Sequence, residues 1–439
     1  MVDGARMDLQ YLDSLARRWQ SLGPPRGRPL ALYVCGPTVY DQAHVGHART
    51  YLLFDTIKRF FLAQGARVAH VQNLTDFEDK LTRRAVRLGV TWKELARREE
   101  RAFVHDMASL GVIPAGWSPR SSEHVNGIIE QIRVLERKGI AYRRGRAVYF
   151  DASAVPASGG NFSADAMLAE HAVPESGTVA EPEAKDPRDF VLWKPSAAPS
   201  PVWPSPWGKG MPGWHLECYV MASHFLPLPL DLHGGGLDLM FPHHYAENLI
   251  SYALRGQPFS RGFLHGAFVT MGDRKMSKSL GNLISIRQAL EDICAPALRC
   301  YLLSKPYRES IEYLEMDARS ADATWHDTQR TFHGLLDGTQ GSGYPVERLE
   351  RGFAKIPRAL AQDINIPEAI RVLHETAADI QAFGRGGLET GDRTRGKKVL
   401  LRMQDLLGLP LLDQGKREPV SSTTVRPFAR SAAADAFSS

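Results

Sequence analysis

The hydrophobic pattern near the start of the chain predicts a strand, a helix and a second strand. Residues 30–34 form an apolar run, and residues 48–63 carry apolar side chains three and four positions apart until the pattern ends at Gly65. This spacing is typical of a helix with one buried face. A second apolar run follows at residues 68–71. This order predicts a βαβ unit with parallel strands, whose ligand crevice lies where the strands end.

The later pattern predicts helices on both sides of an irregular stretch. Residues 91–144 are mainly helical in pattern, most clearly at 123–138, whereas about 153–206 are rich in Ala, Pro, Ser, Gly and Glu with little periodicity. We interpret the irregular stretch as an insertion or a connection, not as a strand of the main sheet. Glycine-rich, strand-like residues return at 231–236, and residues 286–412 are helical in pattern.

These patterns predict an α/β fold in which a Rossmann-like parallel sheet carries an insertion and is followed by a helical bundle. The predicted segments are an N-terminal extension at 1–29, a Rossmann-type catalytic domain at 30–300 with an insertion at about 91–206, a connecting helical region at 301–345, the helical bundle at 346–413 and a disordered tail at 414–439.

Composition excludes several classes of protein. With 43% hydrophobic and 23% charged residues, the chain cannot be wholly disordered, and its formal charge of +5 over 439 residues is too small for a dedicated nucleic-acid binder. The N-terminus lacks a signal-peptide core, and no run of 18 apolar residues occurs. We therefore expect a cytoplasmic protein without a membrane partner. A monomer is the default expectation for its oligomeric state.

Two short motifs carry the first chemical signal. A His-Val-Gly-His string at residues 44–47 lies between the first predicted strand and its helix, and a Lys-Met-Ser-Lys-Ser string follows at residues 275–279. Each string is weak evidence alone, because short motifs arise by chance and a loop histidine or lysine is usually structural. In this order they resemble the HIGH and KMSKS signatures of class I aminoacyl-tRNA synthetases.

That resemblance has a chemical basis. Attack of a carboxylate on the α-phosphate of ATP builds negative charge, which imidazoles at a helix N-terminus and mobile lysines can stabilise. The resemblance implies ATP, with Mg²⁺, as a substrate. It also implies a glycine in the first motif, Gly46, that lets the nucleotide approach the backbone. The implied catalytic residues are His44, His47, Lys275 and Lys278, of which His44, His47 and Lys278 contact ATP.

A second set of residues suggests a metal site. His243 and Glu247 are four positions apart, which places them on one face of a helix. Together with the thiols of Cys35 and Cys218 they form a plausible four-ligand zinc site. The four cysteines of the chain are few and scattered, so metal binding or simple burial is more plausible than a disulfide framework.

Longer stretches around these residues resemble cysteinyl-tRNA synthetases. The resemblance is dense over about 32–308 and thinner at 363–369. The matching stretches are residues 35–51, 73–76, 207–210, 212–218 and 275–282. By this resemblance the chain has a class I synthetase catalytic domain that activates L-cysteine with ATP and transfers it to tRNA(Cys).

The same resemblance implies roles for individual residues. Zinc is held by Cys35, Cys218, His243 and Glu247, and the thiol of the substrate binds the metal. Because serine differs from cysteine by one atom, a soft thiolate bond to Zn²⁺ separates the two better than a hydrophobic pocket could. The residues implied to line the cysteine pocket are Gly36, Thr75, Trp214, His233 and Asp238.

The sequence also departs from the family pattern. Tyr245 and Ala246 stand where the family usually has Glu-Asn, and no anticodon-reading domain is expected after about residue 412. A similar truncation occurs in the mycothiol-pathway cysteine ligase, which delivers cysteine to an amino sugar. The alternative prediction is therefore a cysteine ligase with a small amine or another non-tRNA acceptor.

Lys278 provides a test of the motif assignment. Lys278→Ala should slow adenylate formation and leave the affinity for cysteine nearly unchanged, because its contact is made mainly in the transition state. Cysteine-dependent exchange of pyrophosphate into ATP measures both quantities. An equal collapse of cysteine affinity would mean that this lysine is misassigned.

Overall fold

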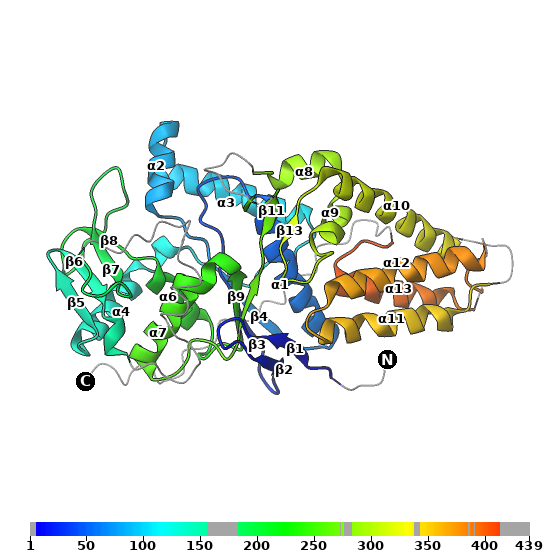
Figure 1. Ribbon diagram of the computed structural model, residues 1–439, viewed down its shortest axis with the longest axis horizontal. Coiled ribbons are helices and arrows are strands. Elements are labelled where there is room, and N and C mark those ends of the chain that lie inside the picture. Colours follow the sequence, from blue (N-terminus) through cyan, green and yellow to red (C-terminus); the bar gives the residue numbers. More distant parts are fainter. Residues whose placement is uncertain are drawn as a thin grey trace.

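The computed structural model describes most of the chain and places a parallel sheet at its centre (Figure 1). An antiparallel sheet lies at one end of the molecule and a helical bundle at the other. The described residues are 6–155, 183–272, 274–275 (backbone only), 283–337, 343–384, 387–389 and 391–412. The predicted tail at 414–439 lies outside these residues.

The central sheet has four parallel strands in the order β10-β9-β3-β4. Their bounds are β3 (Leu30–Val34), β4 (Val68–Gln72), β9 (Leu232–Gly236) and β10 (Phe263–Gly266). Leu30 pairs with Val68, Leu32 pairs with Leu232, and Phe263 pairs with His233. The predicted βαβ unit and parallel sheet are confirmed. The carboxyl ends of β3 and β9 therefore lie side by side.

The helix that links β3 to β4 is α1 (Val45–Ala63). Its buried apolar residues include Leu53, Phe54 and Phe61, which explains the spacing of three and four seen in the sequence. The chain leaves this helix through Gly65, whose positive φ of 73° suits a residue without a side chain. The N-terminus of α1 points to the end of the sheet where β3 stops.

The inserted region forms its own antiparallel sheet, in the order β5-β6-β7-β8. The strands are β5 (Ala141–Arg144), β6 (Ala147–Phe150), β7 (Phe190–Pro195) and β8 (Gly210–Pro212). None of them joins the central sheet, as expected. The expectation of helix up to residue 144 and of irregular chain from 153 to 206 was wrong at β5 and β7. Gly145, with φ of 55°, makes a two-residue turn that pairs β5 with β6.

The remaining elements around the sheets are mainly helices. They are α2 (Asp79–Leu88), α3 (Trp92–Ser109), η1 (Ser121–Glu123), α4 (Val125–Arg137), η2 (Ala152–Ala154), α6 (His215–Phe225), η3 (Leu237–Leu239), η4 (Met240–His244) and α7 (Tyr245–Arg255). A small sheet has the order β12-β11-β13, with β11 (Val269–Met271), β12 (Arg274–Lys275) and β13 (Ile311–Glu312).

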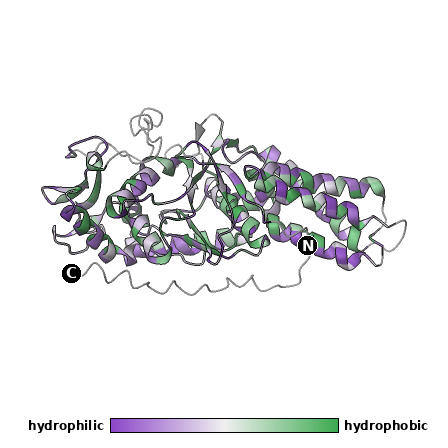
Figure 2. Ribbon diagram, turned by 90° about the horizontal axis from the view of Figure 1, so that it is seen from below, coloured by the Kyte–Doolittle hydropathy of each residue, from purple (hydrophilic) through white to green (hydrophobic). Residues whose placement is uncertain are grey.

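The chain ends in the predicted run of helices. They are α8 (Ile286–Asp292), α9 (Ala295–Leu302), α10 (Glu315–Asp337), α11 (Val346–Ala361), α12 (Ile366–Phe383) and α13 (Arg393–Leu407). Helices of the bundle carry both hydrophobic and hydrophilic residues along their length (Figure 2), as expected where one face is buried. Among the described residues, none of the helices has the length and apolar character that crossing a membrane requires.

The N-terminal extension is ordered as a hairpin of β1 (Leu9–Leu12) and β2 (Trp19–Leu22). Asp13, which is 2% exposed, accepts hydrogen bonds from the backbone N–H groups of Leu15, Ala16 and Phe263. These bonds fix the hairpin against β10.

A buried ion pair joins α1 to α9. Asp55 Oδ2 accepts from Arg59 Nε at 2.7 Å and from Arg299 at 2.5 Å, and its Oδ1 accepts from the Ile113 N–H at 2.8 Å. Burial alone would raise the pKa of Asp55, but the two guanidinium groups and the N–H outweigh burial and hold the pKa below its ordinary value of 3.8.

Asp55→Asn should therefore destabilise the protein by about 3 kcal/mol at neutral pH, because it leaves the Arg299 guanidinium buried without its counter-charge. The wild-type carboxylate is ionised above pH 3.8, so the difference should be complete there and should shrink as the pH falls through the lower folded-state pKa. Urea unfolding of both proteins between pH 7 and pH 3 measures it. A difference that grows on acidification would contradict this assignment.

Candidate metal and adenylate-forming site

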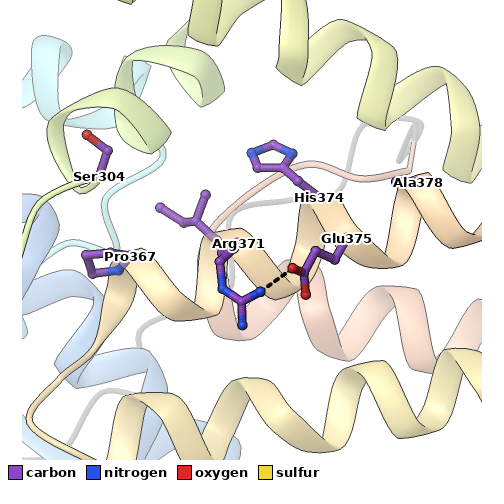
Figure 3. Close-up of a pocket in the computed structure, with 7 residues that line it drawn as sticks. Ser304, Pro367, Arg371, His374, Glu375 and Ala378 are labelled. Atoms are coloured by element: carbon purple, nitrogen blue, oxygen red, sulfur yellow. Dashed lines mark hydrogen bonds and ion pairs between the residues drawn. The ribbon is translucent and has the colours of Figure 1, made fainter.

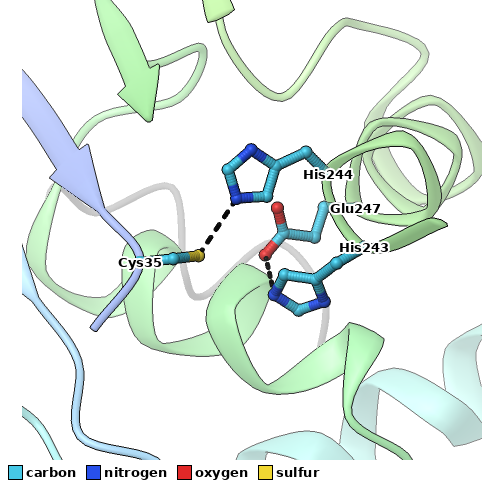
Figure 4. Close-up of side chains that lie close together, drawn as sticks. All are labelled: Cys35, His243, His244 and Glu247. Carbon is cyan, nitrogen blue, oxygen red and sulfur yellow. Dashed lines mark hydrogen bonds and ion pairs between the residues drawn. The ribbon is translucent and has the colours of Figure 1, made fainter. Parts of the chain in front are cut away.

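Two thiols, an imidazole and a carboxylate meet in a buried cluster beside the end of β3. Cys35 directly follows β3, Cys218 lies on α6, His243 lies in η4, and Glu247 lies in the first turn of α7. All four are at most 4% exposed. Figure 4 shows the side chains of Cys35, His243 and Glu247 converging, with His244 beside them.

The distances inside the cluster match the edges of a zinc tetrahedron. Cys35 Sγ lies 3.7 Å from Cys218 Sγ, and His243 Nε2 lies 3.3 Å from Glu247 Oε1. Ligands at about 2.3 Å for sulfur and about 2.05 Å for nitrogen or oxygen would be separated by about 3.8 Å and about 3.3 Å around a tetrahedral zinc ion. Both observed separations agree with these values. The four-residue spacing of His243 and Glu247 does bring their polar atoms together.

The same cluster contains buried polar atoms that the protein leaves without a hydrogen bond. His243 Nε2 and Glu247 Oε1 are fully buried and have no hydrogen-bond partner. Unsatisfied buried polar atoms are rare and costly in native proteins, and an absent ion is one of the ordinary explanations. The donor set and the two unsatisfied atoms therefore fit a zinc ion.

The other atoms of these ligands are fixed by neighbours. His243 Nδ1 lies 3.1 Å from His215 Nδ1, and the ring of His243 stacks on Trp214 with centroids 4.1 Å apart. Glu247 Oε2 lies 2.7 Å from His233 Nε2, while His233 Nδ1 lies 3.1 Å from the Tyr33 carbonyl oxygen. Hydrogen bonds to the far side of metal ligands orient them and keep their metal-binding atoms free.

Two further histidines line the thiol side of the cluster. His244 Nε2 lies 3.2 Å from Cys35 Sγ, and His244 Nδ1 lies 2.8 Å from His265 Nε2. If both imidazoles are neutral, His265 Nε2–H can donate to His244 Nδ1, and His244 Nε2–H can donate to the Cys35 sulfur. Burial favours that state, because it lowers the pKa of His265 to about 3 and that of His244 well below its ordinary value.

Burial also disfavours the charged forms of the cluster itself. It raises the pKa of the Cys35 and Cys218 thiols and of the Glu247 carboxyl, and it lowers the pKa of His243 and, to about 4, that of His215. A bound divalent cation reverses this for thiols and carboxylates, because it stabilises their anionic forms directly.

Sequence reasoning gave no role to His215, His244 and His265. His215 and His244 fall inside stretches that resemble the family, but nothing in their spacing distinguishes them from ordinary core histidines. Their contacts span 28, 209 and 21 residues along the chain, so a local pattern cannot report them.

The residues expected around the substrate lie at the mouth of this cluster or beside it. A side chain on Gly36 would meet the Asn73 carbonyl oxygen at 1.6 Å, so only glycine fits there. Thr75, which is 2% exposed, pairs with Thr38 across the loops that follow β4 and β3. Trp214 stacks on His243, and His233 contacts Glu247, as described above. Asp238 lies in η3, directly after β9, and is exposed.

The His-Val-Gly-His string forms the N-terminus of α1. His44 Nδ1 accepts from the Gly46 N–H at 3.1 Å, His47 Nδ1 accepts from the His44 N–H at 3.3 Å, and the two rings stack at 3.9 Å. A side chain on Gly46 would lie 2.9 Å from the His44 ring, so the glycine makes room for that ring as well as for any ligand. The backbone of Lys275 forms the end of β12. The side chain of Lys275 and the whole of Lys278 lie outside the described residues.

A hollow also lies away from this cluster, in the helical part of the chain. It has a volume of about 470 Å³ and is lined by Ser304 and by residues of α12, including Pro367, Arg371 and His374 (Figure 3). It contains none of the residues predicted for catalysis, substrate or metal, so we attach no catalytic role to it.

Comparison with known proteins identifies the family. Residues 23–323 match the family described as tRNA synthetases class I (C) catalytic domain. A cysteine–tRNA ligase of Thermodesulfovibrio yellowstonii is 36% identical over 85% of this chain and 79% of that protein. A cysteine–tRNA ligase of Aeropyrum pernix is 38% identical over 84% of this chain and 79% of that protein.

The fold agrees with this assignment. Methionyl-tRNA synthetase of Mycobacterium tuberculosis in complex with methionyl-adenylate superposes with a TM-score of 0.60 over 87% of this chain and 89% of that chain, at 17% identity. That likeness concerns the fold alone. Taken with the sequence matches, it shows that the chain belongs to the class I tRNA synthetases and, within them, to the cysteine–tRNA ligase family.

Proposed function

We propose that this protein activates L-cysteine with ATP and transfers the cysteinyl group to tRNA(Cys). In the first step a cysteine carboxylate oxygen attacks the α-phosphate of ATP, which forms cysteinyl adenylate and releases pyrophosphate. In the second step a ribose hydroxyl of the terminal tRNA adenosine attacks the acyl carbon, and AMP leaves. The observation that carries this proposal is the buried pair of thiols with His243 and Glu247 beside the N-terminus of α1.

We propose Cys35, Cys218, His243 and Glu247 as the residues that hold a zinc ion. When bound, zinc would supply a soft Lewis acid that accepts the substrate thiol, which serine cannot offer. Geometry alone also permits His244 as a ligand in place of Cys218, because its nitrogen lies within 4.8 Å of the polar atoms of Cys35, His243 and Glu247. The bond between His244 and Cys35, with His265 behind it, favours His244 as a donor to the thiolate.

The residues of the chain position both substrates around this site. His44 and His47, stacked at the N-terminus of α1, face the developing phosphate charge together with the helix dipole. Lys278 would neutralise the departing pyrophosphate. His233 and Trp214 keep Glu247 and His243 in place, and Gly36, Thr75 and Asp238 border the space for the amino acid.

Removal of one thiol tests the metal assignment. Cys218→Ala should abolish stoichiometric zinc and cysteine binding together, because three ligands cannot hold the ion as four do. Cys300→Ala, which removes another buried thiol outside the cluster, should keep both. Elemental analysis of the purified proteins and cysteine binding by calorimetry measure these quantities. Full zinc content in the Cys218 variant, with the fold intact by circular dichroism, would sink the assignment.

The acceptor is tested separately. With ATP, labelled cysteine and total tRNA, label should enter the tRNA fraction, and ribonuclease should release it. Label that enters only small-amine products would favour the alternative ligase and contradict transfer to tRNA. That the enzyme is a cytoplasmic monomer stays a prediction from the sequence.

A further inference from the structure

Helices α2 and α3 carry a group of basic side chains outside the site already described. We call residues 79–101, which contain α2 and the first half of α3, the basic arm. It has eight basic and four acidic side chains, a formal charge of +4 in a chain whose total is +5. By contrast, residues 346–412 of the bundle have eleven basic and nine acidic side chains. The two helices pack against each other and α2 stands out from the body (Figure 1).

The base of the basic arm borders the proposed active site. Asp79, the first residue of α2, comes four positions after Thr75, which we place at the cysteine pocket. Arg84 lies 3.8 Å from Asp41, in the loop between Cys35 and the first histidine motif. A ligand that reaches the end of β3 from outside would therefore pass close to this arm.

The far side of α3 is tied to α8, which begins beside the first histidine motif. Arg287 of α8 pairs with Asp106 of α3 at 2.8 Å. Two residues earlier, Ser285 pairs with His44 through a backbone bridge. These contacts fix α3 to the rim of the site, so its exposed face keeps a defined position relative to the adenylate.

Three arginines of the basic arm are not neutralised by an acidic side chain within the described residues. Arg87, Arg97 and Arg101 are exposed and make no ion pair within the described part of the chain. Arg97 and Arg101 are four positions apart on one face of α3. Stabilisation of a helix C-terminus could explain Arg87 in the last turn of α2, but it cannot explain two arginines in the middle of α3.

Of these arginines, Arg97 and Arg101 line a groove. The groove has a volume of about 380 Å³, with Val90 and Leu95 as its apolar part and Arg97, Arg98 and Arg101 around it. Glu94 is the one acidic residue of its lining. Guanidinium groups spaced along a helix suit phosphate oxygens, and an apolar floor suits the sugar between them.

The bundle is a weaker candidate for the same role. Three of its arginines are neutralised within the bundle, since Arg348 pairs with Asp379, Arg371 with two glutamates, and Arg395 with Glu347 and Glu350. The basic arm combines exposed arginines that make no ion pair within the described residues with a position at the rim of the site.

We propose that the basic arm binds the sugar–phosphate backbone of the acceptor RNA as its 3′ end enters the site. This inference rests on the proposed function, because it takes tRNA as the acceptor. It adds the surface that recognises the RNA and the three arginines, Arg87, Arg97 and Arg101, that contact its phosphates.

The test is the triple variant R87Q/R97Q/R101Q, assayed in the full chain for both half-reactions. Cysteine-dependent pyrophosphate exchange should be unchanged, whereas kcat/KM for tRNA charging should fall about tenfold or more. The slope of log kcat/KM against log salt concentration should become shallower by about one for each phosphate that the variant no longer neutralises.

Two matched variants sharpen the test. E94Q removes the acidic residue of the groove and keeps a side chain that can cap α3, so it should raise kcat/KM for tRNA. R137Q removes an exposed arginine from the end of α4 and should change nothing. Unchanged tRNA kinetics and salt slope in the triple variant would overturn the proposal. Failure of the wild-type protein to charge any tRNA would instead overturn the proposed function.

Discussion

The central constraint on this molecule is a buried cluster of polar groups that its own side chains do not satisfy. The thiols of Cys35 and Cys218 lie 3.7 Å apart, and His243 Nε2 and Glu247 Oε1 are buried without hydrogen bonds. Burial opposes ionisation of every group in it, so the cluster is costly unless a cation compensates. His215 and His233 contact the other polar atoms of His243 and Glu247, and His244 contacts the Cys35 sulfur. In our account, zinc makes this arrangement stable and lets it select a thiol.

The fold brings the residues of this cluster together from distant parts of the chain. Parallel strands bring the ends of β3 and β9 to one edge, so Cys35 and the loop that carries His243 start from neighbouring positions. Helix α1 begins at the same edge and presents two stacked imidazoles to it. Tyr51, two turns into this helix, donates from its hydroxyl to the Cys35 carbonyl oxygen at 3.4 Å. This bond connects α1 directly to the first residue of the cluster. In our proposal, selection of the amino acid and activation of ATP therefore share one short stretch of chain.

The sequence pattern predicted those features that depend on residues close together in the chain. The βαβ unit and the bundle follow from periodicity, and the closeness of His243 and Glu247 follows from their spacing. The meeting of Cys35 with Cys218, 183 positions apart, came from family resemblance, because no spacing rule relates them. The roles of His215, His244 and His265 depend on distances across the fold and on which ring nitrogen carries a proton. The antiparallel sheet was missed at β5 because a four-residue strand is too short to show its period.

Zinc K-edge X-ray absorption of the purified full-length protein tests the central claim most directly. Our account predicts two sulfur ligands at about 2.3 Å and two nitrogen or oxygen ligands at about 2.0–2.1 Å. Addition of L-cysteine should add one sulfur ligand to the zinc, and L-serine should leave the spectrum unchanged. A protein without stoichiometric zinc, or a spectrum with a single sulfur that L-cysteine does not alter, would contradict it.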